Sequence, residues 1–173
     1  MPNNKGMVHF YTGNGKGKTT AALGLALRSA GLNKRIFIAQ FVKGMHYAEL
    51  NSIKKHESIK LKQFGRDCFI ENEPVEEDIL AAKQGFEEVK KITTSNEYDL
   101  VILDEIFIAM HYNLISQDEV VELIKSKNQN LELVLTGRNA PESLYEYADL
   151  ITEMKEIKHY YNEGIEARPG IEY

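Results

Sequence analysis

A glycine- and lysine-rich stretch at residues 12–20 has the clearest chemical signature in this sequence, since it reads Thr-Gly-Asn-Gly-Lys-Gly-Lys-Thr-Thr. Backbone N–H groups of such a loop, with the N-terminus of a following helix, bind phosphate oxygens. Lys18 would supply a point charge to the phosphates, Lys16 a second cation and Thr19 a hydroxyl ligand for Mg²⁺. The usual phosphate loop starts with glycine where this chain has Thr12. We expect nucleotide binding; the alternative is a glycine-rich turn with solvated lysines.

Two adjacent acids, Asp104 and Glu105, form a second cluster directly after the apolar run Leu100–Leu103. Acids at the end of a buried strand lie where the metal ion of a bound nucleotide sits. The alternative is that Asp104 caps a following helix. A third polar cluster, Thr-Gly-Arg at 136–138, follows another apolar run.

The elements that must position these clusters alternate between strands and helices. Apolar runs predict strands, and the Ala/Leu-rich and amphipathic stretches predict helices. We expect strands at 7–11, 35–41, 59–64, 100–103, 131–135 and 150–157, and helices at 19–30, 48–56, 74–94, 116–127 and from Pro141. Ser116 and Glu119 form a capping box at the start of one helix.

Strands that are apolar throughout are typical of a parallel sheet covered on both faces. The pattern therefore predicts an α/β fold with a mostly parallel sheet flanked by helices. Together with the glycine loop, it indicates a P-loop (RecA-like) nucleotide-binding fold. Ligands of such sheets bind beyond the carboxyl ends of the strands, where all three polar clusters fall. No repeat, linker or charge block divides residues 1–173, so we expect a single domain.

Composition narrows the class of protein further. A net charge of −5 and a pI near 5.6 argue against a main role in holding nucleic acid. The acidic excess lies largely in helices, so a local basic loop can still bind a polyanion. The single cysteine, Cys68, makes no internal disulfide and no four-thiolate metal site, and the histidines show no metal-ligand spacing. We expect a cytoplasmic protein without a membrane span.

A phosphate loop predicts nucleotide binding but leaves the reaction open. Glu105 could act as the base that activates water, as in a RecA-like ATPase or switch protein. Phosphoryl transfer would instead need a second substrate pocket and extra arginines.

Five segments together resemble the ATP:corrinoid adenosyltransferase family of the phosphate-loop type, acting on cob(I)alamin or cob(I)yrinic acid a,c-diamide. The resemblance covers nearly the whole chain and includes the unusual Thr12. The segments are Thr-Gly-Asn-Gly-Lys-Gly-Lys-Thr-Thr-Ala-Ala at 12–22, Gln-Phe-x-Lys-Gly at 40–44, Leu-Asp-Glu at 103–105, Thr-Gly-Arg at 136–138 and the tail at 158–173.

This resemblance implies that a Co(I) corrinoid attacks the 5′ carbon of ATP and releases triphosphate, in adenosylcobalamin biosynthesis or salvage. The reduced cobalt of the substrate is then the nucleophile, so no protein base is required. Lys18 and Glu105 become the expected catalytic residues, and Thr19 and Glu105 the Mg²⁺ ligands. The expected contacts with ATP are Gly13, Asn14, Gly15, Lys16, Gly17, Lys18, Thr19 and Thr20. The family also implies that ATP lies reversed in the loop, that a reductase supplies the electrons and that the enzyme is a homodimer.

On the corrinoid side, the resemblance makes Phe69 the candidate that excludes the lower axial ligand; simple loop packing is the alternative. Some members carry an N-terminal segment that folds over the corrinoid, whereas six residues precede the first expected strand here. The site is then either more open or closed by another element, for which the tail at 159–173 is a candidate. Arg28 and Lys43 are further candidates for the triphosphate, or belong to an exposed helix face and loop.

Overall fold

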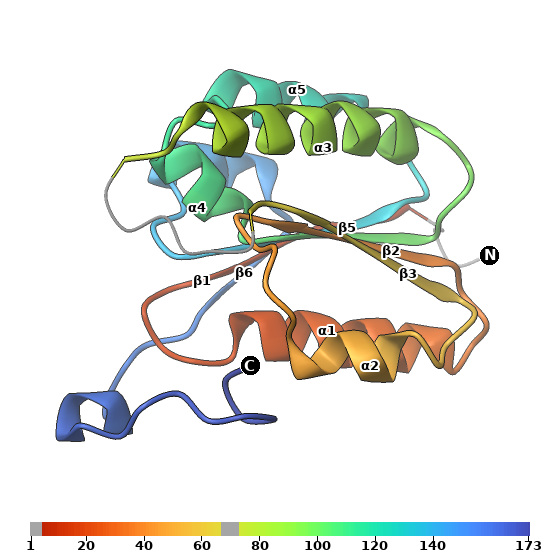
Figure 1. Cartoon of the computed structure of the whole chain (residues 1–173). Coiled ribbons are helices and arrows are strands. Elements are labelled where there is room, and N and C mark those ends of the chain that lie inside the picture. Colours follow the sequence, from red (N-terminus) through yellow and green to blue (C-terminus); the bar gives the residue numbers. More distant parts are fainter. Residues whose placement is uncertain (1–4, 67–72) are drawn as a thin grey trace.

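A computed structural model describes residues 5–66 and 73–173, and it has three layers. Within these residues a six-stranded sheet lies between α1 and α2 on one face and α3, α4 and α5 on the other (Figure 1). Every strand pair is parallel, and the strand order is β3-β2-β4-β5-β1-β6. The predicted fold class, a parallel α/β sheet with helices on both faces, is confirmed.

The six strands lie where the apolar runs predicted them. They are β1 Val8–Thr12, β2 Ile36–Phe41, β3 Ile59–Phe64, β4 Leu100–Asp104, β5 Glu132–Thr136 and β6 Leu150–Glu153. Strands β2 and β4 are buried along their whole length and are apolar except for Gln40 and Asp104 near their carboxyl ends. Strand β6 is exposed at the edge of the sheet.

The expected strand at 150–157 is wrong in its length, because β6 ends at Glu153. The next residue, Met154, turns its backbone toward the glycine loop. Its N–H donates to Thr12 O (2.8 Å) and its carbonyl accepts from the Gly15 N–H (2.6 Å). Met154 therefore links the end of β1 to the glycine loop.

The helices are α1 Lys18–Ala30, α2 Ala48–Ile53, α3 Glu76–Thr94, α4 Ile106–His111 and α5 Gln117–Ser126, with 3₁₀ helices at Glu142–Tyr147 and Tyr160–Glu163. The capping box predicted for α5 is present, with the Ser116 N–H donating to Glu119 Oε2 (2.8 Å) and the Glu119 N–H to Ser116 Oγ (3.3 Å). Helix α2 is shorter than expected. Helix α4 is not among the helices expected from the sequence; a helix at this place is considered there only in the alternative that Asp104 caps it.

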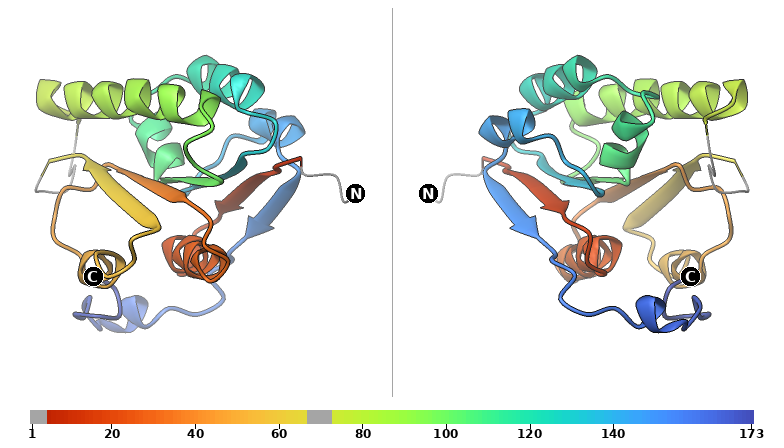
Figure 2. Two further views of the ribbon diagram at one scale, coloured as in Figure 1. Left: turned by 90° about the vertical axis from the view of Figure 1, so that its right-hand side faces the viewer. Right: turned by 90° about the vertical axis from the view of Figure 1, so that its left-hand side faces the viewer.

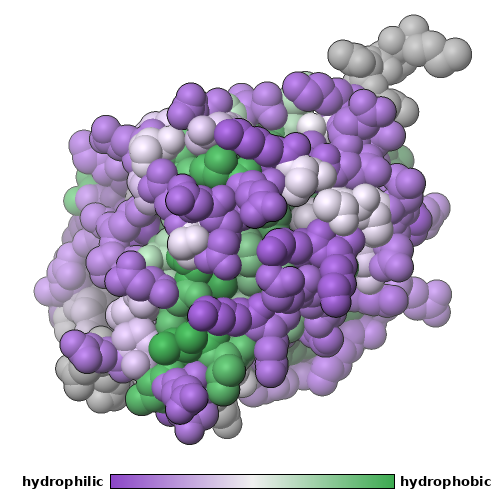
Figure 3. All heavy atoms as spheres, turned by 90° about the horizontal axis from the view of Figure 1, so that it is seen from above, coloured by the Kyte–Doolittle hydropathy of each residue, from purple (hydrophilic) through white to green (hydrophobic). Residues whose placement is uncertain are grey.

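The core has one cluster of apolar side chains on each face of the sheet. Helix α3 contributes Ala82, Phe86 and Val89 to the larger cluster. Seen from the side of α3 and α5, the outer surface is mainly hydrophilic with a smaller hydrophobic area (Figure 3). None of the described helices is long and apolar enough to cross a membrane.

The C-terminal segment leaves β6 and runs back over the side of the sheet that carries α1 and α2 (Figures 1 and 2). It contains the second 3₁₀ helix, Tyr160–Glu163, and ends at Tyr173. This path brings the end of the chain to the glycine loop, more than 140 residues away in sequence.

Close packing between α3 and β3 yields a test of the fold. A Cβ atom at Gly85 would lie 2.3 Å from Phe64 Cγ, so Gly85→Ala should lower the free energy of unfolding by about 1–3 kcal/mol. Gly24 of α1 has open space around it, and Gly24→Ala should raise that free energy by about 0.5–1 kcal/mol. Urea denaturation followed by circular dichroism measures both; equal effects of the two substitutions would contradict this packing.

Candidate functional site

The glycine loop connects β1 to α1 and has the backbone that phosphate binding requires. Gly13 (φ 96°) and Gly17 (φ 122°) have positive φ angles that favour glycine. A Cβ atom at Gly13 or Gly15 would also lie 2.5 or 2.6 Å from Met154 O. In the described structure no side chain caps α1 at Gly17, so the first amides of this helix are available to an anion.

Lys18 lies across this loop and is almost fully buried. Its ammonium donates hydrogen bonds to Gly13 O (2.8 Å) and Gly15 O (2.9 Å). Burial lowers the pKa of Lys18, although the nearby carboxylates of Glu105 and Asp104 act in the opposite direction. The two backbone carbonyls hold the ammonium group at the loop without neutralising its charge. From this position the side chain can turn to a phosphate.

Lys16 contacts the C-terminal segment. Its ammonium donates to Tyr160 OH (2.8 Å) and Ile171 O (2.9 Å) and forms an ion pair with Glu172. Glu172 also accepts hydrogen bonds from Tyr160 and Arg168. Hydrogen bonds from Lys16 and Tyr160 hold the pKa of Glu172 well below its usual range. The glycine loop is therefore connected to the tail by an ionised carboxylate.

Asp104 is the buried anion at the centre of the site, with 1% of its surface exposed. Its Oδ1 accepts from Thr19 Oγ1 (2.9 Å) and Thr136 Oγ1 (2.8 Å), and its Oδ2 accepts from Lys43 Nζ (2.8 Å). Burial alone would raise the pKa of Asp104, but Lys43 and these hydroxyls outweigh it and lower the pKa. The alternative that Asp104 caps a helix is wrong, because α4 begins after Glu105 and has no side-chain cap within the described residues.

Glu105 follows β4 directly and has a left-handed backbone (φ 60°). One carboxylate oxygen, Oε2, is buried and has no hydrogen-bond partner among the described residues. Burial and the charge of Asp104 raise the pKa of Glu105. An unpartnered buried carboxylate oxygen is costly and rare, and such an atom commonly marks a missing ligand.

A hollow of about 590 Å³ opens beside these residues. Thr19, Lys43, Glu105 and Arg138 supply its polar groups, and Tyr47, Tyr112 and Tyr173 supply aromatic rings. A second hollow of about 470 Å³ shares Thr19, Lys43, Tyr47, Glu172 and Tyr173 with it. Both lie at the carboxyl ends of the strands, where a parallel sheet binds its ligands.

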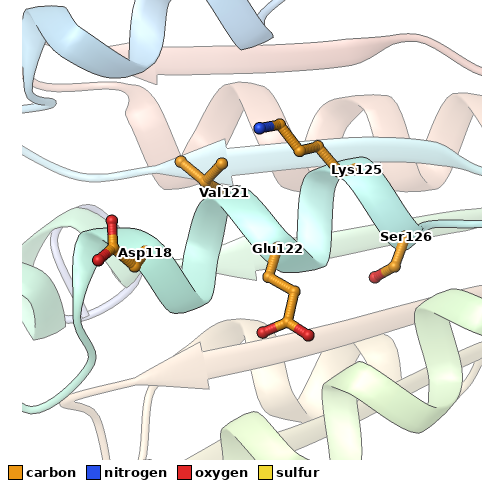
Figure 4. Close-up of a pocket in the computed structure, with 5 residues that line it drawn as sticks. All are labelled: Asp118, Val121, Glu122, Lys125 and Ser126. Carbon is orange, nitrogen blue, oxygen red and sulfur yellow. The ribbon is translucent and has the colours of Figure 1, made fainter.

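A shallower hollow of about 410 Å³ on α5 has no comparable chemistry. Its side chains come from successive turns of one exposed helix, and their polar ends point in different directions (Figure 4). Polar groups that converge from several strands distinguish the site at the glycine loop from this surface.

The sequence offers Lys43 and Arg28 as further candidates for binding the triphosphate, and the structure places Lys43 inside the site. Its side chain is buried against Asp104 and lies 3.3 Å from Thr19 Oγ1. Burial would lower its pKa, but the carboxylates of Asp104 and Glu105 outweigh that effect and raise it. Arg28 is exposed on the last turn of α1 and lines neither hollow. Phe69 lies outside the described residues.

The structure thus brings together the glycine loop, Lys18, Thr19, Glu105 and Asp104, the two acids that the sequence expects near a metal ion. It adds side chains to which sequence reasoning gave no role: Gln40, Thr136, Arg138 and the tail residues Tyr160, Glu172 and Tyr173. The first three lie within the motifs named above, so the motifs themselves were the available signal. Nothing local marked the individual tail residues.

Comparison with known proteins gives a consistent result. The pattern of the family described as ATP:corrinoid adenosyltransferase BtuR/CobO/CobP matches residues 4–173. A corrinoid adenosyltransferase of Sinorhizobium sp. is 37% identical, over 98% of this chain and 81% of the relative. The corrinoid adenosyltransferase of Escherichia coli K12 is 30% identical, over 98% of this chain and 86% of the relative.

The fold has a more distant likeness among solved structures. The crystal structure of the RadB recombinase superposes with a TM-score of 0.55 at 15% identity, over 90% of this chain and 77% of that chain. This likeness concerns the fold alone and agrees with the predicted RecA-like class.

The contact between Lys16 and the tail is testable without a substrate. In Lys16→Met, the amide hydrogens of residues 160–173 should exchange several-fold faster, because Glu172 loses its main partner. The exposed pair Lys158–Glu163 (2.8 Å) is the control, since Lys158→Met removes an ion pair of little energetic weight. Hydrogen exchange with mass spectrometry measures both; an unchanged tail in Lys16→Met would show that Lys16 does not hold it.

Proposed function

The chain belongs to the ATP:corrinoid adenosyltransferase family and transfers the adenosyl group of ATP to a corrinoid, and we propose that it does so with the triphosphate held in the glycine loop as leaving group. The observation that carries this proposal is the uncapped N-terminus of α1 beside the buried Lys18. The Co(I) centre of the corrinoid substrate attacks the 5′ carbon of ATP. The bond from that carbon to the triphosphate oxygen breaks, and triphosphate leaves with the bonding electrons.

The protein contributes positioning and charge to this reaction, because the nucleophile belongs to the substrate. The amides of the glycine loop, together with Lys18, stabilise the negative charge that develops on the triphosphate. Gly13, Asn14, Gly15, Lys16, Gly17, Thr19 and Thr20 complete the proposed ATP contacts. The hollow beside the loop is large enough for an adenosine, and Tyr47 and Tyr112 offer rings to it.

Mg²⁺ fits the oxygen atoms at this site. The unpartnered Glu105 Oε2 and the Thr19 hydroxyl are the hard donors that Mg²⁺ prefers. No three His, Cys, Asp or Glu side chains gather into a metal site among the described residues, so the nucleotide would supply further ligands. The bound ion would neutralise part of the charge on the triphosphate. Asp104, already bonded to Thr19, orients that hydroxyl.

Further proposals rest on family membership and on the sequence. Phe69 excludes the lower axial ligand of the corrinoid, a reductase provides the Co(I) state and the enzyme acts as a cytoplasmic homodimer. Residues 1–173 form a single adenosyltransferase domain.

Product analysis tests the proposed reaction. Incubation with ATP, Mg²⁺ and chemically reduced cobalamin should give adenosylcobalamin and triphosphate in equal amounts, whereas ADP and phosphate would contradict the proposal.

Lys18→Ala should reduce turnover by about 10²–10³-fold, since it removes one charge from the leaving-group site. Lys34→Ala, an exposed lysine in the turn after α1, is the matched control and should leave turnover and fold unchanged.

Glu105→Gln separates this reaction from the alternative of a RecA-like ATPase. As a ligand of the metal ion, Glu105 loses charge in this variant, so the Mg²⁺ concentration needed for half-maximal turnover should rise. As a hydrolytic base it would instead support ATP hydrolysis without corrinoid, and Glu105→Gln would abolish that hydrolysis. Phosphate release measured without corrinoid decides between the two.

A further inference from the structure

Lys43 lies where the cation of a bound nucleotide would be held. Its ammonium is 2.8 Å from Asp104 Oδ2 and 3.3 Å from Thr19 Oγ1, and 14% of its side chain is exposed. Thr19 is the hydroxyl expected to bind Mg²⁺, and Asp104 is the acid that orients it. The Thr19 hydroxyl, which binds the divalent ion in the proposed function, and Asp104, which orients that hydroxyl, therefore both face an ammonium group in this structure.

An ammonium group and a divalent cation cannot occupy this space together. Both are positive, and in a largely buried site charges a few ångströms apart repel strongly. Asp104 nevertheless needs a cation beside it, because a buried carboxylate without a positive partner is costly. Lys43 meets this need in the free protein, and the metal ion would meet it in the nucleotide complex.

The backbone around Lys43 shows that its position is built into the fold. Val42 has a φ of 56°, an unfavourable left-handed conformation for a β-branched residue. The Val42 N–H donates to Phe64 O (3.2 Å), which ties this turn to the end of β3. A Cβ atom at Gly65 would lie 2.6 Å from Lys43 N, so the two loops touch backbone to backbone. Strain of this kind persists only where the surroundings impose it.

We propose that the Lys43 ammonium is an internal counter-ion of the free enzyme, which the divalent ion replaces when the metal–nucleotide complex binds. Lys43 then turns away from Asp104 into the adjoining hollows, which it already lines. This inference rests on the proposed function, since it assumes that the nucleotide arrives with a divalent ion. Its consequence is that the free enzyme excludes divalent ions and that metal and nucleotide bind together. Lys43 acts as a positioning residue.

Removing the lysine should therefore create a cation site. Mn²⁺, which accepts the same oxygen ligands as Mg²⁺, is titrated into the nucleotide-free protein and followed by electron paramagnetic resonance. Lys43→Met should bind Mn²⁺ at least tenfold more tightly than the wild type, and Mg²⁺ should raise its melting temperature. Lys34→Met is the control and should behave as the wild type. Equal Mn²⁺ affinity in wild type and Lys43→Met would overturn the inference.

A measurement on the wild type keeps the test valid if Lys43→Met fails to fold. The side-chain ammonium resonance of Lys43, assigned with Lys43→Arg, should shift on addition of MgATP and remain unchanged with Mg²⁺ alone. A resonance that MgATP leaves unchanged would refute the exchange. Neither readout uses corrinoid or turnover, so these outcomes are independent of whether the products are adenosylcobalamin and triphosphate.

Discussion

The buried carboxylate of Asp104 is the point on which the site depends. It is bonded to Thr19 at the start of α1, Lys43 after β2 and Thr136 at the end of β5, while it belongs to β4. Four elements that are distant in sequence are therefore brought into register by one anion. Because the sheet is parallel, the carboxyl ends of the strands and the N-terminus of α1 lie at one edge, and a single short acid can reach all three partners.

Two ion pairs give the free site its own charge balance. Lys43 lies beside Asp104, where a cation is expected, and Glu172 lies beside Lys16, where a phosphate is expected. This arrangement explains how a chain with a net charge of −5 can bind a polyanion: the positive charges are kept in place by carboxylates that belong to the protein. An incoming metal–nucleotide complex carries both signs of charge. In the proposed function its metal ion takes the place of Lys43 beside Asp104 and its phosphates take the place of Glu172 beside Lys16, so neither Asp104 nor Lys16 is left unpaired.

The sequence predicted what depends on local pattern and missed what depends on a single backbone angle or a distant contact. The central strands and the glycine loop were predictable, since buried strands are apolar throughout and the loop needs glycines at fixed places. Helix α4 was not predicted, because its N-cap residue Glu105 has a left-handed backbone and no capping motif marks its start. Spacing could not show which of the two adjacent acids accepts the hydrogen bond from Thr19; in the structure it is Asp104. The partner of Lys16 lies 156 residues away.

The two internal ion pairs differ in how easily they open, and in the proposed exchange this difference sets the order of events at the site. Glu172 is on an exposed tail, where its pair with Lys16 is screened by solvent and salt. Lys43 is buried next to the strained residue Val42 after β2, and its removal from Asp104 is costly until another cation takes its place. The phosphates can therefore enter by displacing the tail first, and the exchange at Asp104 follows only when a divalent ion arrives with them. A nucleotide without its metal would reach the loop but leave Lys43 against Asp104, so the buried carboxylate makes the completed site conditional on both.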